Sequence, residues 1–157
     1  MVNRWTRDIT AADGRYVSLL AINWDEVSKV VNRLTDRNDY RGIGLLNFHE
    51  SEIGQWKLFF PDAEHVLLNL ESVTSDVTWD TLYPEWIDEE EEYEVPTCPT
   101  LPTIQFSGKP RIDFIAVKLP CNKSGEWSRD VARLHLQLAA AGLAATAKGS
   151  HAVHILL

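Results

Sequence analysis

The sequence lacks the features that mark nucleic-acid-binding, membrane-spanning or disulfide-rich proteins. Its 15 Lys and Arg are outnumbered by 23 Asp and Glu, which gives a formal net charge of −8. Without a basic surface it is a poor binder of phosphate backbones, and we expect no nucleic-acid partner. No apolar run approaches the roughly 20 residues that span a bilayer, and no signal peptide is visible. Two cysteines are too few for a disulfide framework.

Motifs of common catalytic and nucleotide sites are missing as well. There is no Walker sequence, no G-x-S-x-G and no H-E-x-x-H. Gly42 and Gly44 form a G-x-G pair, but the third glycine of a dinucleotide fingerprint is absent, and the pair opens a predicted strand. The Asp-x-Asp pair that holds a divalent ion in many nucleotide-sugar transferases occurs nowhere. We therefore expect no catalytic, cofactor-binding or metal-binding residue in this chain.

The residues that are present predict one folded domain. Hydrophobic residues make up 45% of the chain and aromatic residues 10%, which is typical of a protein with a packed core. Residues 89–110 combine an acidic run with four prolines. Consecutive carboxylates on an extended chain point to alternate sides, so we interpret this stretch as a solvated surface loop and not as a metal site.

Apolar runs and helical spacing alternate along the chain. They predict strands and helices in turn, and parallel strands need such crossover connections. The predicted fold is α/β, a Rossmann-like three-layer sandwich with a mostly parallel sheet, truncated at the fifth strand. It occupies residues 15–157 after an N-terminal segment, 1–14. Because the chain stops inside an apolar strand, we expect a fragment of a longer protein. The predicted strands are 15–23, 42–48, 65–70, 111–119 and 151–157, and the predicted helices are 26–34, 50–60, 77–88 and 126–147.

The junction between the strand 111–119 and the helix 126–147 is a candidate site, since α/β enzymes hold ligands at such turns. Lys118, Arg129 and Arg133 could contact a phosphate or carboxylate there, but the glycine-rich cradle is missing apart from Gly125. The favoured interpretation is a well-capped junction, with Ser124 or Asn122 as the cap. The stripe predicted to pack on the sheet consists of Trp127, Val131, Leu134, Leu138, Ala141 and Ala145.

The remaining candidates have structural alternatives. His135 sits mid-helix and is interpreted as a packed or boundary histidine. His151 and His154, three apart on a strand, point to opposite faces and cannot share a metal. Cys98 and Cys121 could form a disulfide in an oxidising compartment or remain two thiols. Asn122 heads an Asn-Lys-Ser sequon, which would carry a glycan if the chain enters the secretory pathway.

Long runs of the sequence resemble one plant family. The runs are LYPEWIDEEEEYEVPTCPTLP, IDFIAVKLPC and GEWSRDVARLHLQLAAAGLAATAKG, supported by GLLNF, HVLLNLESV and TWDTLYPEW. They resemble the plant UDP-glucuronate:xylan alpha-glucuronosyltransferases of glycosyltransferase family 8. This is the glycogenin-like group, also labelled plant glycogenin-like starch initiation proteins. The likeness covers most of the chain from about Tyr40 onward, and it corresponds to the N-terminal luminal region only.

The resemblance implies a parent enzyme of plant cell-wall synthesis in the Golgi lumen. That parent transfers glucuronic acid from UDP-glucuronate to xylan with retention of configuration and uses manganese. Its membrane anchor and its catalytic domain would lie outside this chain, and no family catalytic residue matches any position here. The chain alone is expected to be inactive, and the resemblance strengthens the expectation that Asn122 meets the glycosylation machinery. A homo-oligomer, a stand-alone Rossmann-like small-molecule-binding domain and an interaction module built on the acidic loop stay open as alternatives.

Overall fold

A parallel β-sheet organises the chain. The structure, a computed structural model, describes residues 14–34, 42–83, 99–105, 110–121, 130–147 and 152–157. Within them the sheet has four strands in the order β2-β1-β3-β4, and every neighbouring pair is parallel. The expected α/β, Rossmann-like fold is confirmed. The strands are β1 (Gly42–Leu46), β2 (Glu64–Leu68), β3 (Phe114–Val117) and β4 (His154–Leu156).

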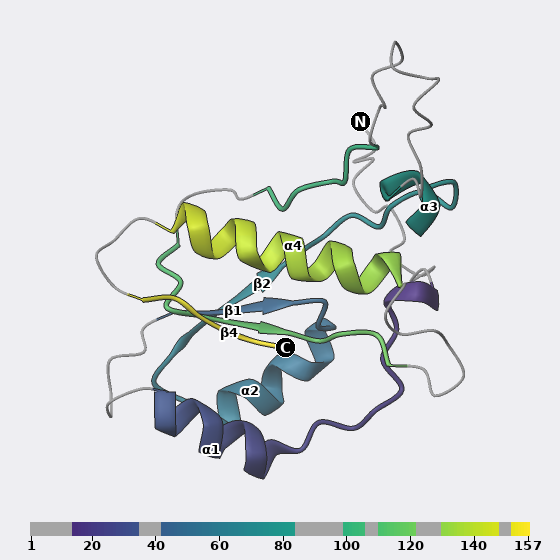
Figure 1. Cartoon of the computed structure of the whole chain (residues 1–157). Coiled ribbons are helices and arrows are strands. Elements are labelled where there is room, and N and C mark those ends of the chain that lie inside the picture. Colours follow the sequence, from purple (N-terminus) through teal and green to yellow (C-terminus); the bar gives the residue numbers. More distant parts are fainter. Residues whose placement is uncertain (1–13, 35–41, 84–98, 106–109, 122–129, 148–151) are drawn as a thin grey trace, which may run out of the picture.

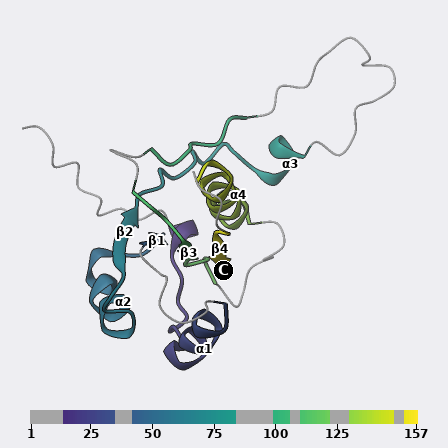
Figure 2. The ribbon, with the colours of Figure 1, turned by 90° about the vertical axis from the view of Figure 1, so that its left-hand side faces the viewer.

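Helices cover the two faces of the sheet. The helices α1 (Trp24–Leu34) and α2 (Ile53–Phe59) lie on one face, and α4 (Val131–Thr146) lies on the other (Figures 1 and 2). Helix α2 connects β1 to β2, whereas α4 connects β3 to β4. The central strands β1 and β3 are buried along their whole length, as a sheet covered on both faces requires.

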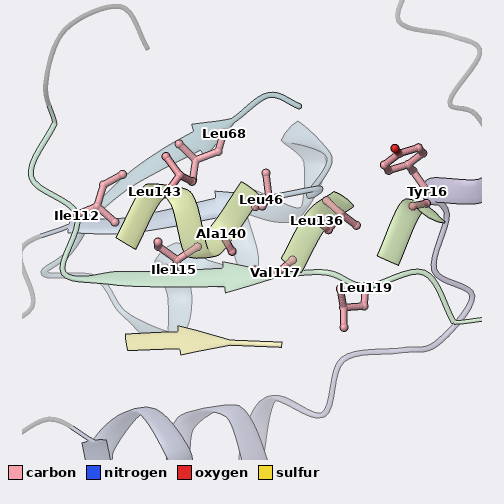
Figure 3. Close-up of a cluster of buried hydrophobic side chains, with 11 residues drawn as sticks. Tyr16, Leu46, Leu68, Ile112, Ile115, Val117, Leu119, Leu136, Ala140 and Leu143 are labelled. Carbon is pink, nitrogen blue, oxygen red and sulfur yellow. The ribbon is translucent and has the colours of Figure 1, made fainter. Parts of the chain in front are cut away.

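Each face of the sheet has its own hydrophobic core. Beneath α4, the side chains of Leu136, Ala140 and Leu143 meet strand residues that include Leu46 and Ile115 (Figure 3). On the other face, Trp56 of α2 is buried among strand and helix side chains. This second cluster consists of Val31, Ile43, Leu45, Trp56, Phe114 and Ala116.

The two glycines of β1 are required by close packing. A Cβ atom on Gly42 would lie 1.8 Å from the Arg111 carbonyl oxygen, and one on Gly44 would lie 2.8 Å from Leu68 Cδ1. Asp113 stabilises this close contact between β1 and the segment that precedes β3 by two hydrogen bonds. Its backbone N–H donates to the Gly42 carbonyl at 2.9 Å, and its Oδ2 accepts from the Gly42 N–H at 3.1 Å. The G-x-G pair therefore serves strand packing.

The prediction of a first strand at 15–23 is wrong. Residues Gly14–Tyr16 form a 3₁₀ turn, η1, and residues 17–23 run to α1 without pairing in the sheet. Leu19 is 77% exposed. Strand propensity needs a neighbouring strand with free backbone groups and a buried face, and this segment has neither. Helix α1 then begins at Trp24, two residues earlier than predicted. Asn23 Oδ1, and not the expected Asp25, caps it by accepting from the Glu26 N–H at 3.3 Å.

Helix α4 differs from its prediction in both its start and its buried face. Asp130 has extended backbone angles and caps the helix by accepting from the Ala132 N–H at 2.9 Å, so the helix begins at Val131 and not at 126. Ser124 and Asn122, the expected caps, lie outside the described residues. Leu138, which was expected on the sheet, is 52% exposed. The buried face instead consists of Val131, Ala132, His135, Leu136, Ala140 and Leu143.

The other predicted elements are present with shorter bounds. The helix expected at 50–60 is a 3₁₀ turn, η2 (Glu50–Glu52), followed directly by α2. The helix expected at 77–88 is described only as α3 (Trp79–Leu82), because residues 84–98 lie outside the described ranges. The expected fifth strand is β4, which becomes the fourth strand because the first one is not formed. Residues 99–105 contain neither helix nor strand, in keeping with a loop.

Candidate functional site

The best candidate position for a site is the gap between the carboxyl ends of β1 and β3. These two strands are neighbours, but the chain leaves them in opposite directions: β1 leads to β2 through α2, and β3 leads to β4 through α4. The two helices cover opposite faces of the sheet (Figure 2). Open α/β sheets bind ligands at such a topological switch point, in the crevice beyond the strand ends.

Asn47 occupies this position directly after β1. Its Nδ2 donates to two carbonyl oxygens, that of Lys118 after β3 at 2.6 Å and that of Tyr16 at 2.8 Å. The φ angle of Asn47 is +63°, the left-handed region that Asn adopts more readily than other non-glycine residues. The strained backbone places the amide where one side chain holds β1, β3 and the turn η1 together.

An ion pair joins the segments that follow β3 and β1. Lys118 Nζ lies 2.6 Å from Glu52 Oε1, and each side chain is about one-fifth exposed (21% and 23%). The other oxygen of Glu52 accepts from the backbone N–H of His49 at 2.8 Å, while His49 Nδ1 accepts from the Ser51 N–H at 3.3 Å. This reciprocal arrangement is a capping box for the turn η2 that leads into α2.

The capping box determines which ligands this turn can accept. In dinucleotide-binding folds the phosphates lie on the backbone N–H groups where the first helix begins. Here Glu52 and His49 already occupy those groups, and a carboxylate at the turn repels an added anion. Lys118 cannot compensate, because Glu52 neutralises it. The junction after β1 is therefore built as a structural tie and not as a phosphate cradle.

A second polar connection joins Tyr16 to His135 within the core under α4. The Tyr16 hydroxyl lies 2.8 Å from His135 Nδ1, and His135 Nε2 lies 2.6 Å from the Pro102 carbonyl oxygen. A carbonyl can only accept, so Nε2 carries the proton and Nδ1 accepts from the tyrosine. The Val73 N–H donates to the same hydroxyl at 3.3 Å, and Arg15 Nη2 donates to the Val73 carbonyl at 2.6 Å. His135 is 1% exposed, so its interpretation as a packed histidine is confirmed.

The structure brings two of the predicted contact residues into the described fold. Lys118 lies at the switch point in the ion pair with Glu52, and Arg133 lies half-buried in the first turn of α4 with a partner of its own. Cys121 is half-buried and has no disulfide partner among the described residues. Arg129, Asn122 and Cys98 lie outside the described residues, so the third contact candidate, the glycan and the disulfide stay predictions.

The residues that close the switch point were not foreseen from the sequence. Asn47 and Glu52 carry no motif, and the only signal was position, since Asn47 directly follows an apolar strand. The buried pair of Tyr16 and His135 is 119 positions apart in sequence, which no local pattern reveals.

Among the described residues there is no group of three or more His, Cys, Asp or Glu placed to hold a metal ion. In the same part of the chain, no helix has the length and apolarity to cross a membrane.

Comparison with known proteins then places the fold in a family. The model of the GUX1-5 N-terminal domain matches residues 13–157, nearly the whole chain. The chain belongs to this family. The match includes all four strands and the switch-point residues. No solved structure resembles the sequence closely enough to be matched.

The chain is also similar to longer proteins of Arabidopsis thaliana. It is 56% identical over 147 residues to "Putative UDP-glucuronate:xylan alpha-glucuronosyltransferase 3", covering 92% of this chain and 24% of that protein. It is 50% identical over 149 residues to UDP-glucuronate:xylan alpha-glucuronosyltransferase 1, covering 91% of this chain and 22% of that protein. The chain thus spans about a quarter of the length of the relatives it matches.

Proposed function

We propose that this chain is the N-terminal domain of an enzyme that transfers glucuronic acid from UDP-glucuronate to xylan. The match to the GUX1-5 N-terminal domain over residues 13–157 is the observation that carries the proposal. The names of relatives that are 56% and 50% identical supply the donor and the acceptor. Identity at this level over nine-tenths of the chain favours a shared role for the domain within the longer proteins.

Within that enzyme, we assign this domain a supporting role and not sugar transfer itself. The switch point between β1 and β3 is closed by Asn47 and by the Lys118–Glu52 pair, which leaves no phosphate cradle after β1. The sequence has no Asp-x-Asp pair for a divalent ion. A nucleotide sugar carries a diphosphate and needs such a cradle or ion, so the donor site belongs to another part of the enzyme.

The cellular setting is part of the same proposal. The parent enzyme belongs to glycosyltransferase family 8, acts in the Golgi lumen during cell-wall synthesis and uses manganese for the donor diphosphate. Membrane attachment comes from an anchor outside this chain. In the lumen, Asn122 would be an acceptor for N-glycosylation, because it heads an Asn-Lys-Ser sequon.

A transfer assay tests the division of labour. Purified residues 1–157 are incubated with UDP-glucuronate and xylohexaose, with and without manganese, beside a full-length Arabidopsis relative as the positive control. We expect glucuronosylated product only from the full-length relative. Manganese-dependent turnover by residues 1–157 alone would refute the supporting role.

A second experiment addresses the luminal setting. The chain is expressed behind a cleavable signal peptide in a eukaryotic host and treated with an N-glycosidase. We expect a loss of mass for the natural sequence and none for Asn122→Gln. An unmodified natural sequence would argue against exposure of Asn122 to the luminal glycosylation machinery.

A further inference from the structure

The short helix α3 and its C-cap residue, Tyr83, carry two aromatic rings outside the layers of the fold. The rings of Trp79 and Tyr83 stack with centroids 4.6 Å apart and an interplanar angle of 29°. Helix α3 contains no buried residue, and Tyr83 is 51% exposed. Both ribbon views place α3 on the α4 side of the molecule, away from α1 and α2 (Figures 1 and 2).

The position of this pair is fixed by its own hydrogen bonds. Thr78 and Thr81 form a capping box in which each hydroxyl accepts from the other residue's backbone N–H, at 3.3 Å and 2.9 Å. The box orients the four-residue helix without help from a core. The two rings are therefore held in a defined geometry at the surface, with Tyr83 exposed and Trp79 half-buried.

The other surface stack in the described part of the chain has a structural explanation that α3 lacks. Trp24 and Phe59 stack at 5.0 Å, but Trp24 also packs edge-on against Trp56, the centre of the second core. That stack closes the edge of the core. The pair on α3 belongs to neither hydrophobic cluster.

The size and surroundings of the pair indicate the kind of ligand. A stable protein interface buries about 800 Å² on each partner around an apolar centre. The segment 74–83 offers two rings bordered by exposed polar residues, namely Thr74, Ser75, Asp76, Thr78, Asp80 and Thr81. This composition suits a pyranose, whose C–H face stacks on an aromatic ring while its hydroxyl groups meet carboxylates and hydroxyls at the rim.

The charge of the segment narrows the choice of sugar. Asp76 and Asp80 are both exposed beside the rings. The Thr74 hydroxyl, followed by the backbone N–H of Asp76 itself, hydrogen-bonds the Asp76 carboxylate and lowers its pKa, so the group is ionised at neutral pH. Two carboxylates repel an anionic ligand such as UDP-glucuronate but accept the hydroxyl groups of a neutral sugar.

We propose that Trp79, Tyr83 and Asp80 form a binding site for the neutral, unsubstituted backbone of xylan. The inference rests on the proposed function, which supplies xylan as the polysaccharide present. The site holds the acceptor chain by stacking and hydrogen bonding and takes no part in transfer. Because its rim is acidic, it binds xylan before glucuronic acid has been added better than xylan that already carries it.

Calorimetric titration of the full chain tests the site. The probes are xylohexaose and a xylo-oligosaccharide that bears one glucuronate. We expect xylohexaose to bind, and Tyr83→Ala to weaken its binding by about tenfold, which is about 1.4 kcal/mol, because the substitution removes one of the two stacking rings. Tyr83→Phe keeps the ring and should change the affinity little. Phe59→Leu removes a ring from the other surface stack and serves as the matched control.

The charge prediction adds an independent readout. Wild type should prefer xylohexaose over the glucuronate-bearing probe, and Asp80→Asn should narrow that preference. Circular dichroism verifies that each variant is folded. No binding of xylohexaose at millimolar concentration, an unchanged affinity in folded Tyr83→Ala, or a loss of affinity in Phe59→Leu equal to that in Tyr83→Ala would overturn the site.

Failure of the xylan-binding site and failure of the proposed function give different results in the calorimetry and the transfer assay. Sugar transfer by residues 1–157 would refute the supporting role, whatever the calorimetry gives. Failure to bind xylohexaose, with no transfer by this chain and transfer by the full-length relative, would overturn the site and leave the assignment as an N-terminal domain standing.

Discussion

Replacing Tyr16 with Phe tests the buried connection between η1 and α4. The substitution keeps the ring, which packs at the end of the core under α4 (Figure 3), and removes only the hydroxyl. His135 Nδ1 then loses its donor at 2.8 Å, and the Val73 N–H loses its acceptor at 3.3 Å. Tyr16 is 8% and His135 1% exposed, so bulk water does not replace the lost partner.

The expected cost follows from those two orphaned groups. Leaving one buried polar group unsatisfied costs about 1–3 kcal/mol. Since the contact to Val73 is long, we expect a total of about 2 kcal/mol. For a domain of this size, that loss lowers Tm by about 4–8 °C.

Thermal unfolding followed by circular dichroism measures the effect. Tyr83→Phe is the matched control, because it removes a hydroxyl from an exposed tyrosine and should leave Tm unchanged. In the double variant Tyr16→Phe with His135→Leu, the losses should fall short of additivity by about 1 kcal/mol if the two side chains interact. A Tm for Tyr16→Phe equal to that of wild type would refute the described network.

Three further predictions concern single positions. Gly42→Ala places a Cβ against the Arg111 carbonyl and should lower the free energy of unfolding by at least about 3 kcal/mol or prevent folding. Gly54→Ala, in open space on α2, is the control and should leave the stability to urea unchanged or increase it. Asn47→Gly relieves the left-handed backbone but loses the bridge to β3, so urea unfolding should find it less destabilising than Asn47→Ala, and the reverse order would contradict the bridge. Burial, with a smaller contribution from Lys57, lowers the pKa of His65. The unfolded chain therefore binds a proton at His65 more readily than the folded chain, and the free energy of unfolding should fall as the pH drops below about 6.5. In His65→Gln this fall should be shallower than in wild type, and an equal fall would contradict the assignment to His65.

The errors in the predicted elements have physical causes. Residues 15–23 have strand-forming composition, yet Tyr16 is held in place by His135 and Asn47, and this keeps the segment at the end of α4 instead of at a sheet edge. In α4, alanines and leucines surround most of the helix, so apolar spacing does not define a unique buried face. Packing on the sheet selects the face with Ala132 and Ala140, both 0% exposed, because their small side chains permit close approach.

The candidate site shows the same division. Lys118 was found because it is a basic residue near the end of a predicted apolar strand. Its partner Glu52 is 66 positions away, and the pairing cancels the charge that made Lys118 a ligand candidate. Trp79 and Tyr83 lie within the predicted helix 77–88. Helical spacing does not encode the position of α3 outside the layers, which leaves Tyr83 exposed and Trp79 half-buried.

By itself, the sequence determined the fold class, the family and the absence of a nucleotide motif. Alternating strands and helices require a parallel sheet, and long matching runs identify a family without any coordinates. Only the tertiary structure decided which face of α4 is buried, how the switch point between β1 and β3 is closed, and which aromatic rings remain exposed. Local spacing records the pattern within one element, whereas these outcomes depend on contacts between residues far apart in the chain, such as Asn47 with Lys118 and Tyr16 with His135.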